Sequence, residues 1–151
     1  MKLGCSFFLA ALAIFGADVP NLSGTWNLDV SKSSWGRKAK PQNVVVRVEH
    51  SEPQLKYSGT VTDVNGDQTT FEVATTIDGQ QHPAKTSYGP GQITVKRINP
   101  YTLTSEFRSD DGKFEETATT MVSPDGRTMT RHMHNKGPDG EATWTEVYDK
   151  Q

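Results

Sequence analysis

The sequence has little of what several common kinds of protein require. Its 151 residues include a single cysteine, Cys5, at the start of the N-terminal apolar segment. Without that segment the chain has no thiol, which excludes disulfides, cysteine-ligated zinc and a cysteine nucleophile and suits an oxidising compartment. Cys5 also precedes the apolar run, whereas a lipid-modified cysteine would follow it, so lipidation is excluded.

An excess of one charge is also lacking. The formal net charge is -2, and acidic and basic residues are interspersed without a basic stripe. This balance excludes the electrostatic surface that a nucleic acid needs, so we expect no nucleic-acid partner. The sequence also lacks a glycine-rich phosphate loop and a Gly-x-Ser-x-Gly nucleophile motif, and we expect no bound cofactor.

No apolar run in the sequence is long enough to cross a membrane. The longest extends from Phe7 to Phe15, which is shorter than the ~20 residues that a spanning helix requires. It follows an early lysine and precedes small residues, and so predicts a signal peptide over residues 1–17, cleaved near Gly16 or Ala17. An uncleaved anchor is the alternative. We therefore expect a secreted or periplasmic protein that is not inserted in a membrane after cleavage.

Residues 18–151 show turn signals in place of a helical period. Gly, Asn and Asp recur about every nine to fourteen residues, for example in "VNGD" from Val64 and "PDG" from Pro124, a rhythm typical of antiparallel hairpins. These residue types tolerate the backbone of tight hairpin turns. "YGPGQ", which begins at Tyr88, is interpreted as one more turn.

Between the turns, apolar and polar residues alternate with the period of a half-buried strand. The alternation predicts a weak strand at Gln81–Thr86 and nine clearer ones: Gly24–Val30, Asn43–His50, Gln54–Asp63, Gln68–Ile77, Ile93–Ile98, Thr102–Ser109, Lys113–Val122, Thr128–His134 and Ala142–Asp149. Strands with one apolar face need closure to protect their edges, and hairpins in sequence order favour an up-and-down arrangement. We predict an all-β, up-and-down antiparallel β-barrel of about 8–10 strands, one domain over residues 18–151, and expect a monomer.

The two ends of the predicted barrel carry motifs of a known superfamily. "GTWNLD", residues 24–29, resembles the Gly-x-Trp opening of the calycins, which include the lipocalins and the fatty-acid-binding proteins. "EVYDK", residues 146–150, is similar to the last strand of the fatty-acid-binding group. As a whole the chain resembles small exported bacterial proteins with this lipocalin-like pattern. The resemblance implies a barrel with an internal cavity and Trp26 at its base.

One position departs from the fatty-acid-binding pattern. That group holds the ligand's carboxylate with an Arg and a Tyr two residues apart on the last strand. Here Tyr148 stands in the Tyr position, but Glu146 occupies the Arg position. The resemblance therefore implies a container without implying a fatty acid as its content.

Four charged residues lie on the inward, otherwise apolar phase of the predicted strands: Arg97, Glu116, Arg131 and Glu146. A lone buried charge is costly, so such residues pair, meet water or bind something polar. Glu116, Arg131 and Glu146 belong to three consecutive strands and are expected to form one interior row. They either orient a ligand, form structural ion pairs or lie at the barrel ends in solvent.

The remaining candidates support few alternatives. His132 and His134 are two residues apart on one strand face, but a zinc site needs a third ligand and both fall on the polar phase, so we predict no metal site. Trp35 lies in the connection from Ser31 to Gln42, where Gly36 and Pro41 leave room for at most a turn or two of helix. It either caps the mouth of the barrel or packs on the outer wall, and packing is favoured.

The function favoured by the sequence is non-catalytic binding of a small, largely apolar or amphipathic molecule inside the barrel. The predicted ligand-binding residues are Trp26, Tyr57, Phe71, Phe107, Glu116, Met129, Arg131, Trp144, Glu146 and Tyr148. One alternative is a protein-binding or inhibitor module with a filled core. A less favoured one is a small barrel enzyme that uses Glu116 and Glu146 as acid and base.

Overall fold

The structure, a computed structural model, describes residues 18–151; the predicted signal peptide lies outside the described residues. The ten strands are β1 (Gly24–Leu28), β2 (Asn43–Ser51), β3 (Gln54–Thr62), β4 (Gln68–Thr76), β5 (Gln81–Thr86), β6 (Gly89–Asn99), β7 (Thr102–Ser109), β8 (Glu115–Val122), β9 (Thr128–Gly137) and β10 (Gly140–Lys150). Over this range no helix forms, and thus none that is long and apolar enough to cross a membrane.

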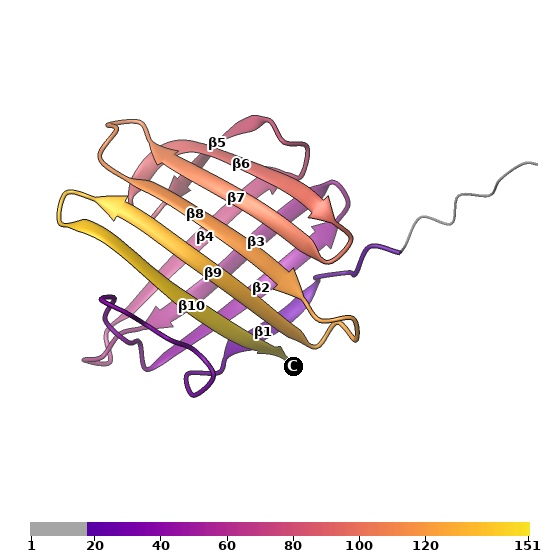
Figure 1. The fold of residues 1–151 in the computed structure, drawn as a ribbon, viewed down its shortest axis with the longest axis horizontal. Helices are drawn as coiled ribbons and strands as arrows, with labels where there is room; N and C mark the ends of the chain where they lie inside the picture. The colour runs from indigo at the N-terminus through magenta and orange to yellow at the C-terminus, as the bar shows by residue number, and fades with distance from the viewer. Residues whose placement is uncertain (1–17) are drawn as a thin grey trace, which may run out of the picture.

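The strands form one curved antiparallel sheet in the order β4-β3-β2-β1-β10-β9-β8-β7-β6-β5 (Figure 1). Every neighbouring pair is consecutive in sequence except β1 and β10, which join the two ends of the chain through pairs such as Trp26 with Lys150. This confirms the predicted up-and-down antiparallel barrel. Closure is incomplete between β4 and β5, where the two edges are linked by an isolated bridge between Ile77 and Val95 of β6 and by a hydrogen bond from the Gly79 N–H to the Val95 carbonyl at 2.9 Å.

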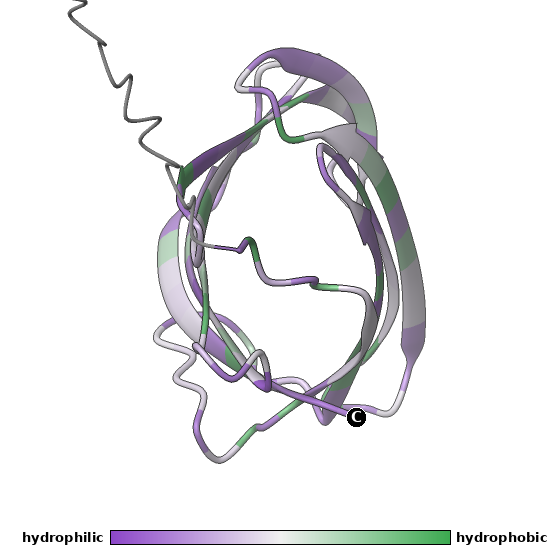
Figure 2. Cartoon of the chain, turned by 90° about the vertical axis from the view of Figure 1, so that its right-hand side faces the viewer, coloured by the Kyte–Doolittle hydropathy of each residue, from purple (hydrophilic) through white to green (hydrophobic). Residues whose placement is uncertain are grey.

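The N-terminal segment, residues 18–23, covers one end of the barrel. Figure 2 shows this segment crossing the end that faces the viewer, directly after the grey trace. Leu22 is buried, its N–H donates to Nδ1 of His50 at 3.2 Å, and its carbonyl accepts from the Trp26 indole N–H at 2.9 Å. Trp26 itself is 0% exposed. We call this closed end the base.

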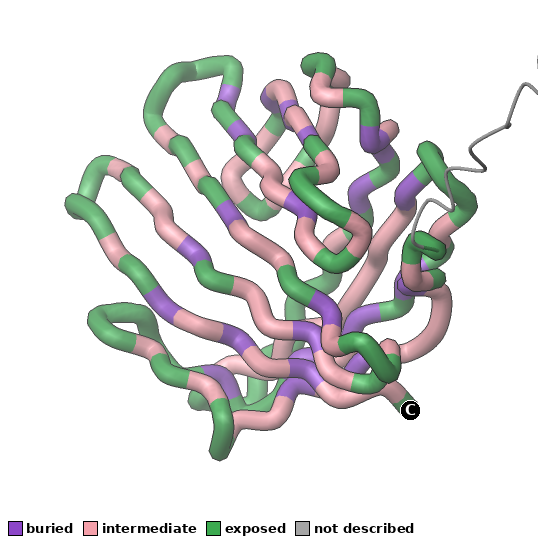
Figure 3. Tube along the Cα trace, turned by 45° about the vertical axis from the view of Figure 1, so that its right-hand side comes forward, coloured by how far each residue is buried: buried purple, intermediate pink, exposed green. Residues whose placement is uncertain are grey.

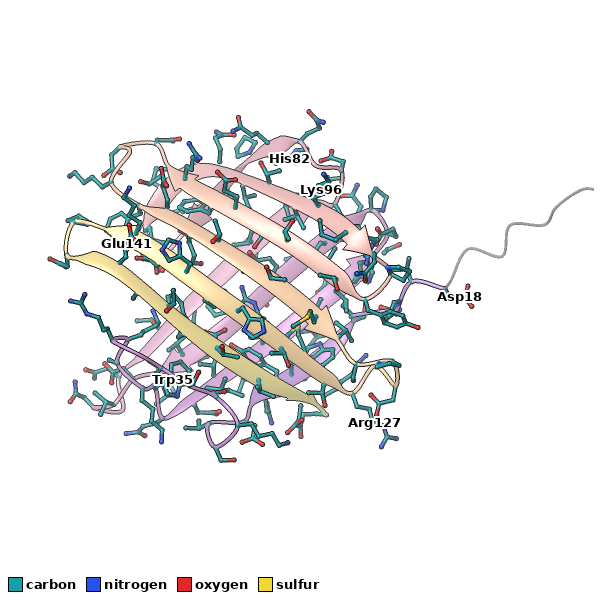
Figure 4. The ribbon with its side chains drawn as sticks, in the orientation of Figure 1. Asp18, Trp35, His82, Lys96, Arg127 and Glu141 are labelled. Atoms are coloured by element: carbon teal, nitrogen blue, oxygen red, sulfur yellow. The ribbon has the colours of Figure 1, made fainter. Side chains whose placement is uncertain are left out.

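The opposite end, the mouth, carries the connection between β1 and β2. Figure 4 shows Trp35 and Glu141 toward this end, and Asp18 and Arg127 toward the base. Ser34 forms a bridge with Thr145 of β10, and Trp35 packs against the buried Ala118, Met133 and Trp144. Trp35 therefore fills the inside of the barrel, and the expectation that it packs on the outer wall is wrong. The cause is that residues 34–36 continue alongside β10 after β1 ends.

Buried and exposed residues alternate along the strands, as the sequence pattern requires (Figure 3). The predicted strands supply nearly all of the buried hydrophobic side chains, and Leu22, which precedes β1, is an addition. The buried polar side chains Thr75, Ser109 and Glu146 also lie in these strands. The main correction concerns "YGPGQ". The expected turn is confined to its start, because Pro90, Gly91 and Gln92 already pair with β5.

Gly59 on β3 marks a close approach inside the barrel wall. A Cβ atom at this position would lie 2.5 Å from both the Phe71 ring and the carbonyl oxygen of Val45. Neither the neighbouring backbone nor a packed aromatic ring yields easily, so a side chain here forces the wall apart.

We predict that Gly59→Ala lowers the free energy of unfolding by about 1 to 3 kcal/mol because it overpacks the wall. Urea denaturation of residues 18–151 measures the change. Ser58→Ala, on the outward phase of the same strand, is the matched control and should change stability little. An unchanged midpoint for Gly59→Ala would contradict the close packing of β2, β3 and β4.

Candidate functional site

A polar cluster lies inside the barrel on β9 and β10, made of Arg131, Trp144, Glu146 and Tyr148. The Glu146 carboxylate accepts three hydrogen bonds, from the Trp144 indole N–H at 2.8 Å, the Tyr148 hydroxyl at 2.9 Å and an Arg131 N–H at 3.3 Å. Glu146 is only 8% exposed. A carboxylate this deeply buried is stable only when donors surround it, which these three side chains achieve.

Strand register brings the cluster together. Arg131 lies directly opposite Glu146 in the β9–β10 pair, so their side chains point to the same face at the short separation of cross-strand neighbours. Trp144 and Tyr148 lie two residues on either side of Glu146 on β10 and therefore share its inward face. The cluster follows from local alternation and one register alone.

The cluster keeps Arg131 charged and Tyr148 protonated. Burial alone opposes the charge of Arg131, but the neighbouring Glu146 carboxylate and the tyrosines Tyr148 and Tyr57 outweigh it and raise its pKa. Burial, and then the charge of Glu146, raises the pKa of Tyr148. Arg131 and Glu146 thus form an internal ion pair, and Tyr148 acts as a donor to it.

Glu116 belongs to a second polar contact, nearer the mouth. Its carboxylate accepts a hydrogen bond from the Tyr88 hydroxyl at 2.9 Å, and the Tyr88 ring stacks on Phe114 with centroids 4.8 Å apart. On the β8–β9 pair Glu116 lies opposite Asn135, whereas Thr120 lies opposite Arg131. The expected row of three charges is therefore wrong in part: Arg131 and Glu146 contact each other, and Glu116 contacts Tyr88.

Burial dominates the electrostatics of Glu116. It raises the pKa of this carboxyl, and the charge of Arg131 and the hydrogen bond from Tyr88 offset only part of the rise. Lys38, from the β1–β2 connection, also acts on Glu116; its ammonium lies 4.3 Å from the centre of the Trp144 ring. A raised acid pKa means that the folded state holds the proton more tightly than the unfolded chain does.

An internal cavity of about 70 Å³ lies between the base and the polar cluster. Its walls are mostly aliphatic, with Leu22 from the base segment and Met129 from β9 among them. The polar residues that line it are Tyr57, Ser105, Thr120 and Arg131. Arg131 lines this cavity, and 24% of its side chain is exposed.

All ten residues predicted to bind ligand face the interior, but they occupy different places in it. Tyr57, Met129 and Arg131 line the cavity. Phe71 packs edge-on against Tyr57 with ring centroids 6.3 Å apart, and Phe107 packs against Tyr88 at 6.5 Å. Trp26 closes the base, Glu116 lies near the mouth, and Trp144, Glu146 and Tyr148 complete the polar cluster. Their role in binding stays a prediction.

Sequence reasoning missed four residues of the interior, Leu22, Tyr88, Ser105 and Thr120, and the exposed Lys38 whose ammonium lies over the Trp144 ring. Ser105 and Thr120 lie on the inward phase between apolar neighbours, so the period-two pattern was sufficient to find them. Tyr88 was hidden in the presumed turn "YGPGQ". Leu22 and Lys38 lie outside the strands, where no periodicity indicates that Leu22 is buried or that Lys38 contacts Trp144.

Other predicted features lie outside the cavity. His132 contacts the Thr145 hydroxyl at 3.0 Å and His134 contacts Glu141 at 3.2 Å, both on exposed positions of the outer face. Arg97, on the inward phase, lies at the base and donates to both carboxylate oxygens of Glu52, at 3.0 and 2.8 Å. A larger open depression of about 620 Å³ lies around His50, Thr75 and His82 near the base. None of the ten predicted ligand-binding residues lines it.

Comparison with solved structures identifies the fold. The chain is similar to zebrafish ileal bile acid-binding protein in complex with cholic acid, with a TM-score of 0.57 and 14% identity over 85% of this chain and 98% of that one. It is also similar to a Schistosoma mansoni fatty acid binding protein in complex with arachidonic acid, with a TM-score of 0.59 and 13% identity over 89% and 98%. The chain therefore has the calycin fold. No protein-family model and no curated protein sequence matches it.

The raised pKa of Glu116 predicts a pH dependence of stability. Between the pKa of an unfolded Glu and the raised folded pKa, the native state binds more protons than the unfolded chain, so the contribution of Glu116 to stability falls as pH rises. Glu116→Gln keeps an acceptor for Tyr88 and removes the charge. We expect the variant to gain stability relative to the parent protein on going from about pH 4 to about pH 7.

Urea denaturation at both pH values measures this difference. Several surface acids, Asp29 and Asp111 among them, have lowered pKa values and make both proteins more stable as pH rises, and this common effect cancels in the difference. Glu115→Gln, exposed on the same strand, is the matched control. A difference that shrinks with rising pH would show that Glu116 is not held in a desolvated environment.

Proposed function

We propose that the protein binds a small, largely apolar molecule inside its barrel and performs no catalysis on it. The observation that carries the proposal is the cavity beneath the polar cluster, with aliphatic walls and a few polar groups at one side. A core whose only task is stability has no use for three hydroxyls and a guanidinium around a void, because apolar side chains fill such space at lower cost. Few polar groups in an apolar chamber are typical of ligand sites.

The similar structures support this proposal through their ligands. They are described in complex with cholic acid and arachidonic acid, both amphipathic molecules with a large apolar part. The barrel of this chain offers the same kind of container at low sequence identity. The identity of its ligand depends on the residues of this chain and is not given by those complexes.

The size of the cavity favours a second candidate function, a protein-binding module with a filled core. About 70 Å³ is below the ~300 Å³ at which ordinary ligand pockets begin. Ligand binding therefore requires the interior to widen. The segments placed to allow this are the β1–β2 connection at the mouth and the incompletely paired β4 and β5. A barrel that does not widen would act through its outer surface.

Binding of the uncharged fluorophore N-phenylnaphthylamine separates the two functions. We expect residues 18–151 to enhance its fluorescence with saturation, and native mass spectrometry of the purified protein to reveal a co-purified apolar mass. Thr120→Phe fills the cavity from its wall and should weaken probe binding about tenfold or more, since it removes the space that the probe occupies.

Thr119→Phe is the matched control, since Thr119 is the preceding residue on β8 and points to the other face. It should bind the probe as the parent protein does. Circular dichroism establishes that both variants are folded. Absence of saturable binding by the folded parent protein would reject the carrier and favour the filled-core module.

We also propose that residues 1–17 direct export and that the mature protein is secreted or periplasmic. The supporting observations are the short apolar run from Phe7 to Phe15 and the absence of any cysteine after Cys5. Expression of the full chain in a bacterial host, followed by fractionation and N-terminal sequencing, should yield a periplasmic product that begins near Ala17 or Asp18. Full-length protein retained in the membrane fraction would favour an uncleaved anchor.

A further inference from the structure

The cation that lines the cavity already has its counterion from the same chain. Arg131 forms a salt bridge with Glu146 at 3.3 Å, and Glu146 is held in place by Trp144 and Tyr148. Arg131 therefore does not present an unbalanced positive charge to the interior. A ligand that reaches it meets an ion pair with no net charge.

The nearest further charges do not change this balance. Glu116 acts on Arg131 from the mouth side and is itself opposed by Lys38. A carboxylate brought into the cavity would add a second anion beside Glu146. Burying a charge without a partner of its own is more costly than one polar contact can offset.

The groups around the cavity suit a neutral polar atom instead. The side chains of Tyr57, Ser105 and Thr120 line it, and each carries a hydroxyl. Within residues 18–151 the side-chain hydrogen bonds nearest to the cavity join other residues: Arg131 and Tyr148 with Glu146, and Tyr88 with Glu116. Burial raises the pKa of Tyr57, so its hydroxyl keeps its proton. A hydroxyl both donates and accepts, so a ligand hydroxyl finds partners of either kind here, including the remaining N–H groups of Arg131.

We propose that the cavity selects an uncharged amphipathic molecule, with a hydroxyl as its polar group on an aliphatic body, over the carboxylate of the same chain length. The inference rests on the proposed function and narrows its ligand class to alcohols. Glu146 is the residue that determines this selection, because it neutralises Arg131. The last strand thus excludes the acid that the barrel shape alone would accept.

Displacement of N-phenylnaphthylamine by decanol and by decanoate tests the proposal with residues 18–151 near pH 7. Decanol should displace the probe at a concentration about tenfold or more below that of decanoate, because the buried anion costs more than the ~1.4 kcal/mol that a tenfold change in affinity represents. Equal displacement, or stronger displacement by decanoate, would overturn the proposal.

Glu146→Gln tests the assigned cause. The variant keeps an acceptor for Trp144 and Tyr148 and leaves Arg131 without a counterion, so decanoate should gain about tenfold or more relative to decanol. Glu141→Gln removes an exposed carboxylate from the same strand and should leave the preference unchanged. An unchanged preference in Glu146→Gln would overturn the role of Glu146.

A measurement on the unmodified protein keeps the proposal testable if Glu146→Gln does not fold. Near pH 4, just below the pKa of about 4.3 of an ordinary carboxyl, more than half of the decanoate is neutral decanoic acid. Its displacement of the probe should then approach that of decanol, whose own displacement over the same pH range is the reference. If the acid gains nothing relative to decanol, charge exclusion is overturned.

Failure of this inference is distinguishable from failure of the proposed function. If the protein binds the probe but decanol does not displace it better than decanoate, the alcohol selectivity is wrong and the internal site remains. If the folded protein binds no probe, the proposed function is wrong and the inference falls with it.

Discussion

The pairing of β1 with β10 is the constraint on which the rest of the structure depends. It joins the first strand to the last and so unites β1–β4 and β5–β10 in one curved sheet, which gives the inward side chains a common interior. Closure of this kind also removes the exposed strand edges that would otherwise pair with other chains. Because the β4 and β5 edges lack such a ladder, the barrel keeps one seam where its wall is held by a few local contacts.

Closure of the barrel buries charged side chains that need partners, and the polar cluster provides them. The last two strands place Arg131 and Glu146 inside, where neither charge is tolerable alone. Their direct pairing, with Trp144 and Tyr148 as further donors to the carboxylate, satisfies both at once. The same arrangement divides the interior into an apolar chamber toward the base and a second polar contact, Glu116 with Tyr88, toward the mouth.

The similar structures establish the fold of this chain but not its ligand. The barrel matches bile acid-binding and fatty acid binding proteins over most of its length, but the identities of 14% and 13% carry only the fold. Within that fold, Glu146 forms an ion pair with Arg131 inside the barrel, so Arg131 presents no unbalanced positive charge to the interior.

The strands, the inward phase and the barrel were predictable from the sequence, because turn residues and period-two alternation are local properties that survive without knowledge of strand partners. Tertiary structure alone decided which interior residues meet. Strand register places Arg131 next to Glu146, whereas Glu116 contacts Tyr88. The three charges nevertheless share the inward phase of three neighbouring strands. Tertiary structure also decided that Leu22 closes the base, that Trp35 turns inward and that a cavity of about 70 Å³ remains. These features depend on how far the strands are offset and how side chains from distant segments fill shared space, and no local pattern contains that information.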